Sequence, residues 1–399
     1  MARPLWIRIG RGVGIALGVI VLLVAVLLVG LNTPPGRSFL AHQIGGFETA
    51  SGLRIGVGRI EGSLYGRMTL TGLEVRDPQG VFLRADRLTL DWRPFAYLTQ
   101  RKVAVRELGS PEVRLLRRPA LKPVPSDPNA PWLPDIDVAL GRLAIDRLVI
   151  EPPVTGKRHV VRLAGSADIA DGRARIRADA RALAGPGVAG GDVLALTLDA
   201  VPDANRLMLD ATLDAPRGGL VDSFTALGKP LAFSIRGRGD WAKWDGRLLG
   251  RVGGATVADL TLAARDGRVT VKGDTLPGAI VTGPAARLTA PELAVDLAAT
   301  LAERRADLRL ALRSRALAVD AAGRVDLGRN RFGALTVTAA LLEPGSIAEA
   351  VRGRDIRLAA TLDGPFATPA VAYKLSAASL GFGTMAVEGL AAEGKATVD

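Results

Sequence analysis

Along most of the chain, apolar and polar residues alternate with a period of two, which is typical of β-strands with one apolar and one solvated face. Aspartate followed by glycine, a strong signal for a tight hairpin turn, separates such stretches at Asp171, Asp266 and Asp363, and Asp77-Pro78-Gln79-Gly80 separates two earlier ones. The pattern therefore predicts an all-β protein in which most neighbouring strands are antiparallel. The clearest apolar positions are Leu194, Leu196, Leu198, Leu207, Leu209, Leu293, Val295, Leu297, Leu308, Leu310 and Leu312.

Single glycines inside the alternating stretches, such as Gly66 and Gly72, predict bulges or bends that curl the sheet. If about 22 strands stack at roughly 4.8 Å, the array approaches about 100 Å as an upper limit. An elongated, curled sheet is therefore expected in place of a compact domain.

Three short helices are expected to interrupt the strands. The first lies within Arg37–Gly52, where Phe39, Leu40, Ile44 and Phe47 form its apolar side. The second begins near Gly219, and the third lies after Glu343, where Ser346 and Glu349 have the spacing of a capping box. An alternating stretch follows each of the last two, which is a weak internal similarity.

The amino-terminal region contains an apolar run of 20 residues without a charge, 12–31. At about 1.5 Å per residue, a helix of this length crosses a hydrocarbon core of roughly 30 Å. Three arginines precede the run, so the positive-inside rule leaves the amino terminus in the cytoplasm. A cleaved signal peptide is the alternative, although its apolar core is usually only about 7–15 residues long. We expect a retained membrane anchor.

These patterns divide the chain into four segments. The segment 118–134 carries six prolines, which cannot complete a β-ladder, so it is predicted to be a surface loop. We expect a cytoplasmic tip and transmembrane anchor at 1–35, a helix and β-sheet segment at 36–117, the proline-rich loop at 118–134, and an elongated β-groove at 135–399 that continues beyond the last residue.

Composition and charge narrow the function. Hydrophobic residues make up 48% of the chain but aromatic residues only 4%, so the apolar face is aliphatic. The net charge of +12 comes mainly from arginines that are scattered singly along strands, without a basic block or an aromatic platform. We therefore expect no nucleic-acid partner, and a solvated strand face or contact with anionic headgroups instead.

Residues for catalysis or metal binding are sparse. The chain has no cysteine, and its two histidines, His42 and His159, are far apart in sequence. Carboxylates such as Asp199 lie at strand ends and turns, where they commonly form the turn. The glycines around Gly56 and Gly58 lack the spacing of a dinucleotide motif, because Glu61 stands where the third glycine belongs. No catalytic residue, metal site or cofactor is predicted.

Alternation alone leaves the role of the apolar face open. The face can pack against a second sheet as a dry core, or it can line an open trough that holds acyl chains. The eleven aliphatic positions named above are the candidates for lipid contact.

Three short sequences near the amino terminus carry a family resemblance: "GSLYG" at 62–66, "LTGLEVRDPQG" at 70–80 and "ADRLTLDWRP" at 85–94. Together with the anchor, they resemble the amino-terminal region of the TamB family, the inner-membrane component of the translocation and assembly module. The resemblance covers residues 1–183, and beyond them only the strand character is similar. The motif residues are Gly62, Ser63, Leu64, Gly66, Leu73, Asp77, Gly80, Asp86, Leu88, Leu90 and Trp92.

The resemblance implies a single-pass inner-membrane protein of a Gram-negative bacterium, with an AsmA-like β-taco in the periplasm. It implies transport of phospholipids between the inner and outer membranes and a role in outer-membrane biogenesis. It implies no catalytic residue. The alternative is a scaffold that assembles outer-membrane β-barrel proteins with a TamA-like partner, whose contact domain we expect outside these 399 residues.

A third hypothesis, a carbohydrate-binding β-protein, is weaker. Such proteins present aromatic platforms to their ligands, and Trp241 and Trp244 are the only tryptophans close together in the sequence. The leading expectation is a non-enzymatic lipid conduit.

Overall fold

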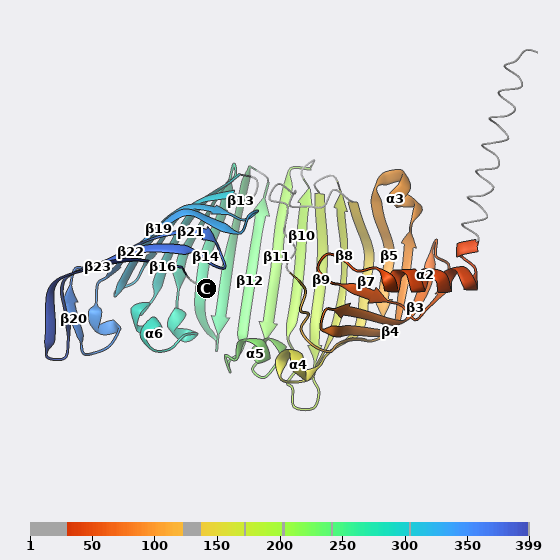
Figure 1. The fold of residues 1–399 in the computed structure, drawn as a ribbon, viewed down its shortest axis with the longest axis horizontal. Coiled ribbons are helices and arrows are strands. Elements are labelled where there is room, and N and C mark those ends of the chain that lie inside the picture. The colour runs from red at the N-terminus through yellow and green to blue at the C-terminus, as the bar shows by residue number, and fades with distance from the viewer. Residues whose placement is uncertain are drawn as a thin grey trace, which may run out of the picture. The chain divides into compact units, whose positions relative to one another are not determined.

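A computed structural model of the chain describes residues 30–122, 137–170, 173–201, 204–240, 242–302 and 305–397. The predicted membrane span at 12–31 lies outside the described residues except for its last two positions. Among the residues that the structure describes, no helix is long and apolar enough to cross a membrane. Strands dominate, as the alternation predicted (Figure 1).

The chain divides into two compact units. The first holds the described residues up to 122 together with Ala139–Val154, and the second holds Asp137, Val138 and the described residues from Thr155 onward. The elements of the first unit are α2 (Pro34–Gly46), β1 (Arg54–Gly56), β2 (Arg59–Gly62), β3 (Arg67–Asp77), β4 (Gly80–Arg93), α3 (Phe95–Gln100), β5 (Lys102–Ser110), β6 (Val113–Leu115), β7 (Asp137–Ile150) and α4 (Pro152–Thr155), whose last residue belongs to the second unit.

In the first unit, β3 is paired on one side with β4 and on the other with both β1 and β2. The break between β1 and β2 falls opposite Gly72, which has a φ of 66°, and the Gly58 amide donates to the carbonyls of Thr71 and Gly72 there. Gly72 therefore marks an irregularity, as predicted. β7, which follows the proline-rich segment, pairs with β5 and runs parallel to β6.

The second unit is a meander of antiparallel strands in chain order. Its elements are β8 (His159–Ala170), β9 (Arg173–Leu183), β10 (Val193–Val201), β11 (Arg206–Ala215), α5 (Leu220–Thr225), β12 (Leu231–Gly239), β13 (Lys243–Val252), β14 (Ala255–Arg265), β15 (Arg268–Thr275), η2 (Pro277–Ala279), α6 (Pro284–Leu288), β16 (Leu293–Ala302), β17 (Arg305–Arg313), β18 (Leu317–Asp326), β19 (Arg331–Leu341), η3 (Pro344–Ser346), β20 (Val351–Arg354), β21 (Ile356–Pro365), β22 (Ala370–Phe382) and β23 (Met385–Thr397).

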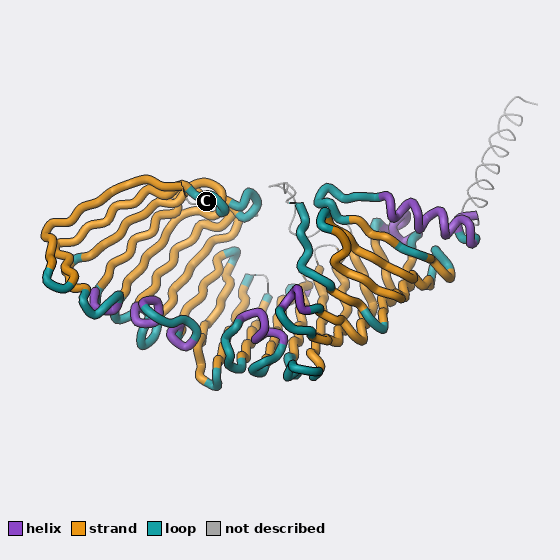
Figure 2. The backbone as a smooth tube through the Cα atoms, turned by 60° about the horizontal axis from the view of Figure 1, so that its bottom comes forward, coloured by secondary structure: helices purple, strands orange, loops and turns teal. Residues whose placement is uncertain are grey.

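The sheet of the second unit is a single layer. Each strand makes its main contacts with the strands hydrogen-bonded beside it. The short helical segments lie at the ends of the strands and leave the faces of the sheet uncovered (Figure 2). The second unit thus differs from a sandwich, in which a second sheet would cover the apolar side.

Three of the longer loops lie at the same end of the meander, four strands apart. They are the loops after β11, β15 and β19, which contain α5, η2 with α6, and η3. Cationic side chains link successive loops: Lys229 donates to the carbonyl of Ala279, and Arg287 donates to the carbonyls of Ser346 and Ile347. The two similar stretches predicted from the sequence correspond to the loops after β11 and β19. The loop after β15 is a third member of the same series.

The turn predictions had mixed outcomes. Asp77 and Gly80 close the β3–β4 hairpin, and Asp266 and Gly267 close the β14–β15 hairpin with φ values of 48° and 80°. The prediction at Asp363 was wrong, because Asp363-Gly364 lies inside β21 and the chain turns only after Pro365. The prediction at Asp171 lies outside the described residues.

Two further local predictions were wrong. Gly66 lies in the turn between β2 and β3 and does not form a bulge in a strand. The helix expected after Glu343 is only the 3₁₀ turn η3, which ends at Ser346, and β20 begins at Val351. The capping-box spacing did not suffice, because β20 begins only five residues after Ser346 and leaves room for little more than one helical turn.

The first predicted helix is present as α2, but its packing face differs from the prediction. Phe39 is 60% exposed, and Phe47, just beyond the helix, is 69% exposed. Ala41 is buried instead, and Leu40 packs beside it. Nothing is described of the side chain of Ile44.

Candidate functional site

The eleven aliphatic positions predicted from the sequence share one face of the second unit. Residues directly opposite each other in an antiparallel pair point to the same face. Leu198 lies opposite Leu209 and Leu297 opposite Leu310, while Val295 lies opposite Leu312. The strands from β12 to β15 pair in register and connect the positions on β10 and β11 with those on β16 and β17.

One row of paired positions crosses the sheet from β8 to β23 without a charged residue, and we call it the central row. It consists of Ala167, Ile176, Leu198, Leu209, Gly237, Gly246, Leu262, Val271, Leu297, Leu310, Ala321, Val337, Ala360, Tyr373 and Gly394. The register therefore forms a continuous apolar surface, which we call the apolar face.

The adjacent residues along the same strands alternate onto the opposite face and are mostly polar or charged, so we call it the polar face. Thr197, Asp210, Arg236 and Arg247 follow one another there in register on β10 to β13. Because a register shift of one residue exchanges the two faces, the uninterrupted central row shows that the pairing keeps all strands in phase.

The apolar face is open at several positions in the described part of the second unit, whereas others near the strand ends, such as Ala215 and Val252, are buried. Leu194 is 40% exposed and Leu301 is 46% exposed. Further along, Leu358 and Tyr373 are each 39% exposed. Side chains of a sealed core would be close to fully buried, so this face is not the dry interior of a sandwich.

Aromatic rings on the apolar face lie over glycines. A Cβ atom at Gly237 would come within 1.8 Å of the Trp244 ring, and one at Gly246 within 2.5 Å of it. The Tyr373 ring occupies the corresponding space at Gly394. The two glycines in the middle of the central row are therefore covered by indole. Trp241, the other member of the predicted aromatic pair, lies outside the described residues.

Open recesses in the second unit are lined by side chains of the polar face. One of them measures about 830 Å³ and is lined by Thr197, Met208, Asp210 and Arg236, among others. Leu209, Leu308 and Leu310 border such recesses only beside polar-face neighbours. These recesses are therefore distinct from the predicted trough lined by leucine side chains.

Ion pairs between neighbouring strands keep the carboxylates of the polar face charged. A hydrogen bond from Arg206 lowers the pKa of Asp199, and Arg175 adds to the effect. A hydrogen bond from Arg247 likewise lowers the pKa of Asp259. The polar face therefore remains ionic, and the two faces differ sharply in polarity.

A buried histidine, which the sequence did not single out as special, attaches α5 to the end of the sheet. His159 is 1% exposed, and its Nε2 lies 3.1 Å from the hydroxyl of Ser223. The Ser223 hydroxyl donates to the carbonyl of Gly219, so it accepts from the imidazole. Asp192, which is also buried, accepts the backbone amides of Leu220 and Val221 at the start of α5.

This cluster is built for anchoring. The serine hydroxyl already donates its proton to a carbonyl, so the imidazole does not act on it as a base. Burial lowers the pKa of His159 and so favours its neutral form, although Asp192 opposes the shift. The groups come from positions up to 64 residues apart, so no local motif announced them.

The "GSLYG" motif forms the turn between β2 and β3 in the first unit and packs against α2. Leu64 is 9% exposed and belongs to a buried cluster with Ala41, Ile60 and Met68. The backbone amide of Leu64 donates to the side chain of Asn32, 2.9 Å away. The motif thus fixes the segment that directly follows the predicted anchor.

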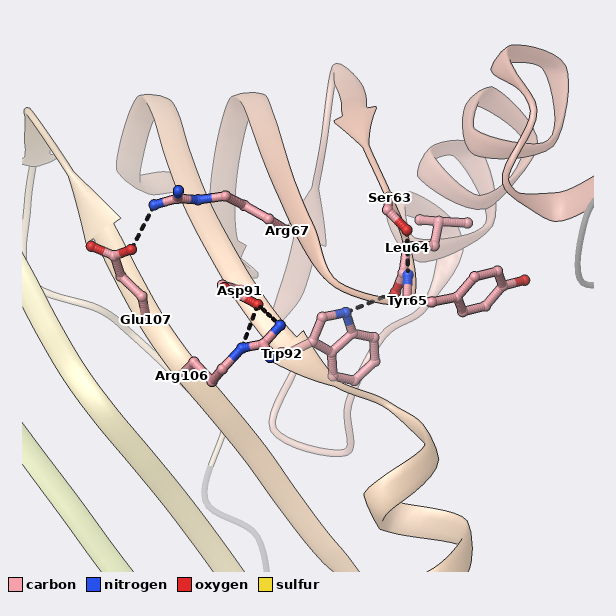
Figure 3. A network of polar contacts seen from close by, with 8 residues as sticks. All are labelled: Ser63, Leu64, Tyr65, Arg67, Asp91, Trp92, Arg106 and Glu107. Atoms are coloured by element: carbon pink, nitrogen blue, oxygen red, sulfur yellow. Dashed lines mark hydrogen bonds and ion pairs between the residues drawn. The ribbon is translucent and has the colours of Figure 1, made fainter.

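The "LDWRP" part of the motif holds that turn from the other side (Figure 3). The Trp92 indole donates to the carbonyl of Leu64 at 2.8 Å, and the Trp92 amide donates to the carbonyl of Gly66. Asp91, beside Trp92, pairs with Arg106 on β5. These contacts give the motif residues of this stretch a structural role.

The remaining motif residues lie on β3, β4 and their connecting turn. Asp77 is buried and accepts the amides of Gln79 and Ala120, and Arg117 pairs with it. Hydrogen bonding from Arg117 holds the pKa of Asp77 well below its usual range. The motif positions Leu73, Gly80, Asp86, Leu88 and Leu90 belong to the same hairpin.

The described residues contain no group of three or more histidine, aspartate or glutamate side chains placed to hold a metal ion. No protein-family model, curated protein or solved structure matches the chain. The functional argument therefore rests on the two faces of the second unit.

Proposed function

We propose that the protein binds hydrocarbon chains of lipids on the apolar face of the second unit and conducts them across successive strands. The observation that supports this most directly is the central row, which is apolar over its whole length while its side chains remain partly exposed. A surface of this kind needs an apolar partner, because soluble proteins rarely expose large continuous apolar patches.

The energetics favour binding and permit movement. Each methylene transferred from water to an apolar surface contributes about 0.8 kcal/mol. Successive rungs of the central row are chemically similar, so a chain that leaves one rung gains nearly the same contacts on the next. The two flat-lying rings over Gly237, Gly246 and Gly394 cover gaps in the row without adding a charge.

The cargo and setting follow from the resemblance to the TamB family. We propose a single-pass protein of the inner membrane whose β-groove lies in the periplasm and carries phospholipids between the inner and outer membranes. The apolar run at 12–31 and the fixed turn at Leu64 support the anchored arrangement. No residue of the described part supplies an energy source, so direction would come from a gradient or a partner.

Photo-crosslinking tests the proposal. A crosslinker at Leu196 or Leu297 is expected to capture phospholipid in cells, because both side chains lie on the apolar face. Thr197 and Thr261 are matched controls on the polar face of the same sheet. Equal lipid capture at all four positions, or none at the two leucines, would contradict a lipid path on the apolar face.

The second candidate function is a scaffold that assembles outer-membrane β-barrel proteins with a TamA-like partner. The observation that favours it is β23, which in the described residues pairs with β22 alone and presents Met385 and Val387 at 72% and 54% exposure. Such an edge can add a strand from another chain. Proline substitutions along β23 should impair assembly while lipid capture at Leu196 persists.

A further inference from the structure

Ion pairs across the strands neutralise much of the charge on the polar face of the second unit. Lys272 on β15 lies 2.9 Å from Asp296 on β16, and Arg313 on β17 lies 2.6 Å from Asp320 on β18. In both pairs, the cation and the carboxylate come from neighbouring strands. An arginine of this face without such a partner carries a charge that no neighbouring carboxylate offsets.

Arg268 on β15 and Arg309 on β17 are two such arginines. Both are exposed, and neither side chain has a hydrogen bond or ion pair with any residue that the structure describes. Both nevertheless line the same open recess, which measures about 630 Å³. The recess also contains Arg324 and Asp307, whose side chains pair with each other at 3.2 Å.

The register places the two arginines near each other on the polar face. Arg268 lies opposite Thr300 on β16, and Arg309 lies opposite Ala298 on the same strand. One strand, β16, thus lies between β15 and β17, so the axes of these two strands are about 9.6 Å apart. Only Ala298 and Thr300 lie between them on this face. Because both side chains are short, the two long arginine side chains border an open space above β16.

The charge of this recess is unbalanced. Three guanidinium groups face one carboxylate among its lining residues, which leaves a formal charge of +2. The larger recess on β10 to β13 is a natural comparison, because Arg236 and Arg238 there face Asp210 and Asp245 and the formal charges cancel. The two recesses therefore differ in the net charge of their lining residues.

We propose that the recess over β15 to β18 binds a phosphate group, with Arg268 and Arg309 as its main ligands. The planar guanidinium group presents parallel N–H donors that match two phosphate oxygens, and two such groups on opposite sides clamp the anion. The Thr300 hydroxyl supplies a further donor from the floor. The site is independent of the apolar face and takes either a soluble phosphorylated compound or a lipid headgroup.

Titration with inorganic pyrophosphate tests the site in the full chain in detergent. The double variant Arg268→Gln/Arg309→Gln is expected to bind at least tenfold more weakly than the unaltered protein at low ionic strength. The control Arg236→Gln/Arg238→Gln removes the same charge from the neutral recess and is expected to change binding less than twofold. Circular dichroism checks that both variants keep their strand content.

Equal loss of pyrophosphate affinity in the two double variants would show a diffuse effect of charge and would overturn the proposed site. Undiminished pyrophosphate binding by Arg268→Gln/Arg309→Gln would also overturn it. Lipids added to the detergent distinguish the two sources of phosphate. If phosphatidylglycerol, but not phosphatidylcholine, displaces pyrophosphate from the unaltered protein, the ligand is a headgroup. Pyrophosphate binding without such displacement supports a soluble ligand. Lipid capture at Leu196 is unaffected in either case.

Discussion

A charge placed on the open apolar face should be tolerated by the fold but should block acyl chains. The test is Leu194→Asp in β10. Leu194 is 40% exposed, so about three-fifths of its side-chain surface is covered. Complete burial of a leucine is worth about 1.5–3 kcal/mol, so losing this contact should cost about 1–2 kcal/mol of local stability. The new carboxylate reaches water and needs no buried partner.

The matched control is Val252→Asp in β13. Val252 is only 3% exposed, so the carboxylate would lack both water and a partner. We expect this substitution to unfold its strand locally, with a loss well beyond that at Leu194. Hydrogen exchange, followed strand by strand with mass spectrometry, measures both effects without assuming that the whole chain unfolds in one step.

Acyl binding provides the second measurement. If the carboxylate at Leu194 displaces about four methylenes from the surface, the loss is about 3 kcal/mol, or roughly a two-hundredfold lower affinity at that site. A fluorescent fatty acid reports this change. Equal damage to the fold by Leu194→Asp and Val252→Asp would show that the apolar face is covered in solution. Intact acyl binding in Leu194→Asp would show that the chain lies elsewhere.

Two further substitutions and one change of pH test other parts of the structure. Leu64→Ala should destabilise the first unit by about 2–4 kcal/mol, because it leaves a cavity beneath α2, and hydrogen exchange in α2 should rise accordingly. Gly237→Ala should displace the Trp244 ring, because the methyl group would fall within 1.8 Å of it, and tryptophan fluorescence should shift towards that of solvated indole. Burial lowers the pKa of His159 below the ordinary value of 6.5. The attachment of α5 should therefore be fully stable above pH 6.5 and weaken as the pH falls below it. Hydrogen exchange in α5 at pH 7.5 and at pH 5.5 measures this difference.

Each of these has a control in the same unit. Leu121→Ala removes an exposed leucine of the first unit, and an equal loss there would contradict the role of Leu64. Gly278→Ala adds a methyl group with no contact closer than 3.8 Å, so an equal fluorescence change would discount the ring contact. In His159→Gln the dependence on pH should disappear, and its persistence would assign the titration to another group.

Much of the fold could be predicted because alternation is a local property that tertiary contacts reinforced here. Leu198, Leu209, Leu297 and Leu310 fall in one row because the strands from β10 to β17 pair in phase along it, and hairpins such as that at Asp266 help to keep this phase. The openness of the face could not be predicted, because a dry core and an open surface require the same alternation.

Other features depended on long-range contacts. His159, Asp192 and Ser223 meet only because three separate connections reach the same end of the sheet. The recess at Arg268 and Arg309 depends on which carboxylates the register brings near each arginine, and single arginines in a sequence do not reveal this. Asp363-Gly364 failed as a turn because β21 continues past it to pair with β19.

The single-layer construction of the second unit has a mechanical consequence. Because each strand is held mainly by its two neighbours, stability adds up rung by rung along one dimension, as in other repetitive proteins. A break between two strands would separate the array into two pieces that each keep most of their contacts. The sheet can therefore bend or separate between one pair of strands while the other pairs stay intact. A longer sheet of the same kind can be built by adding blocks of four strands, each with its own loop at the end of the strands.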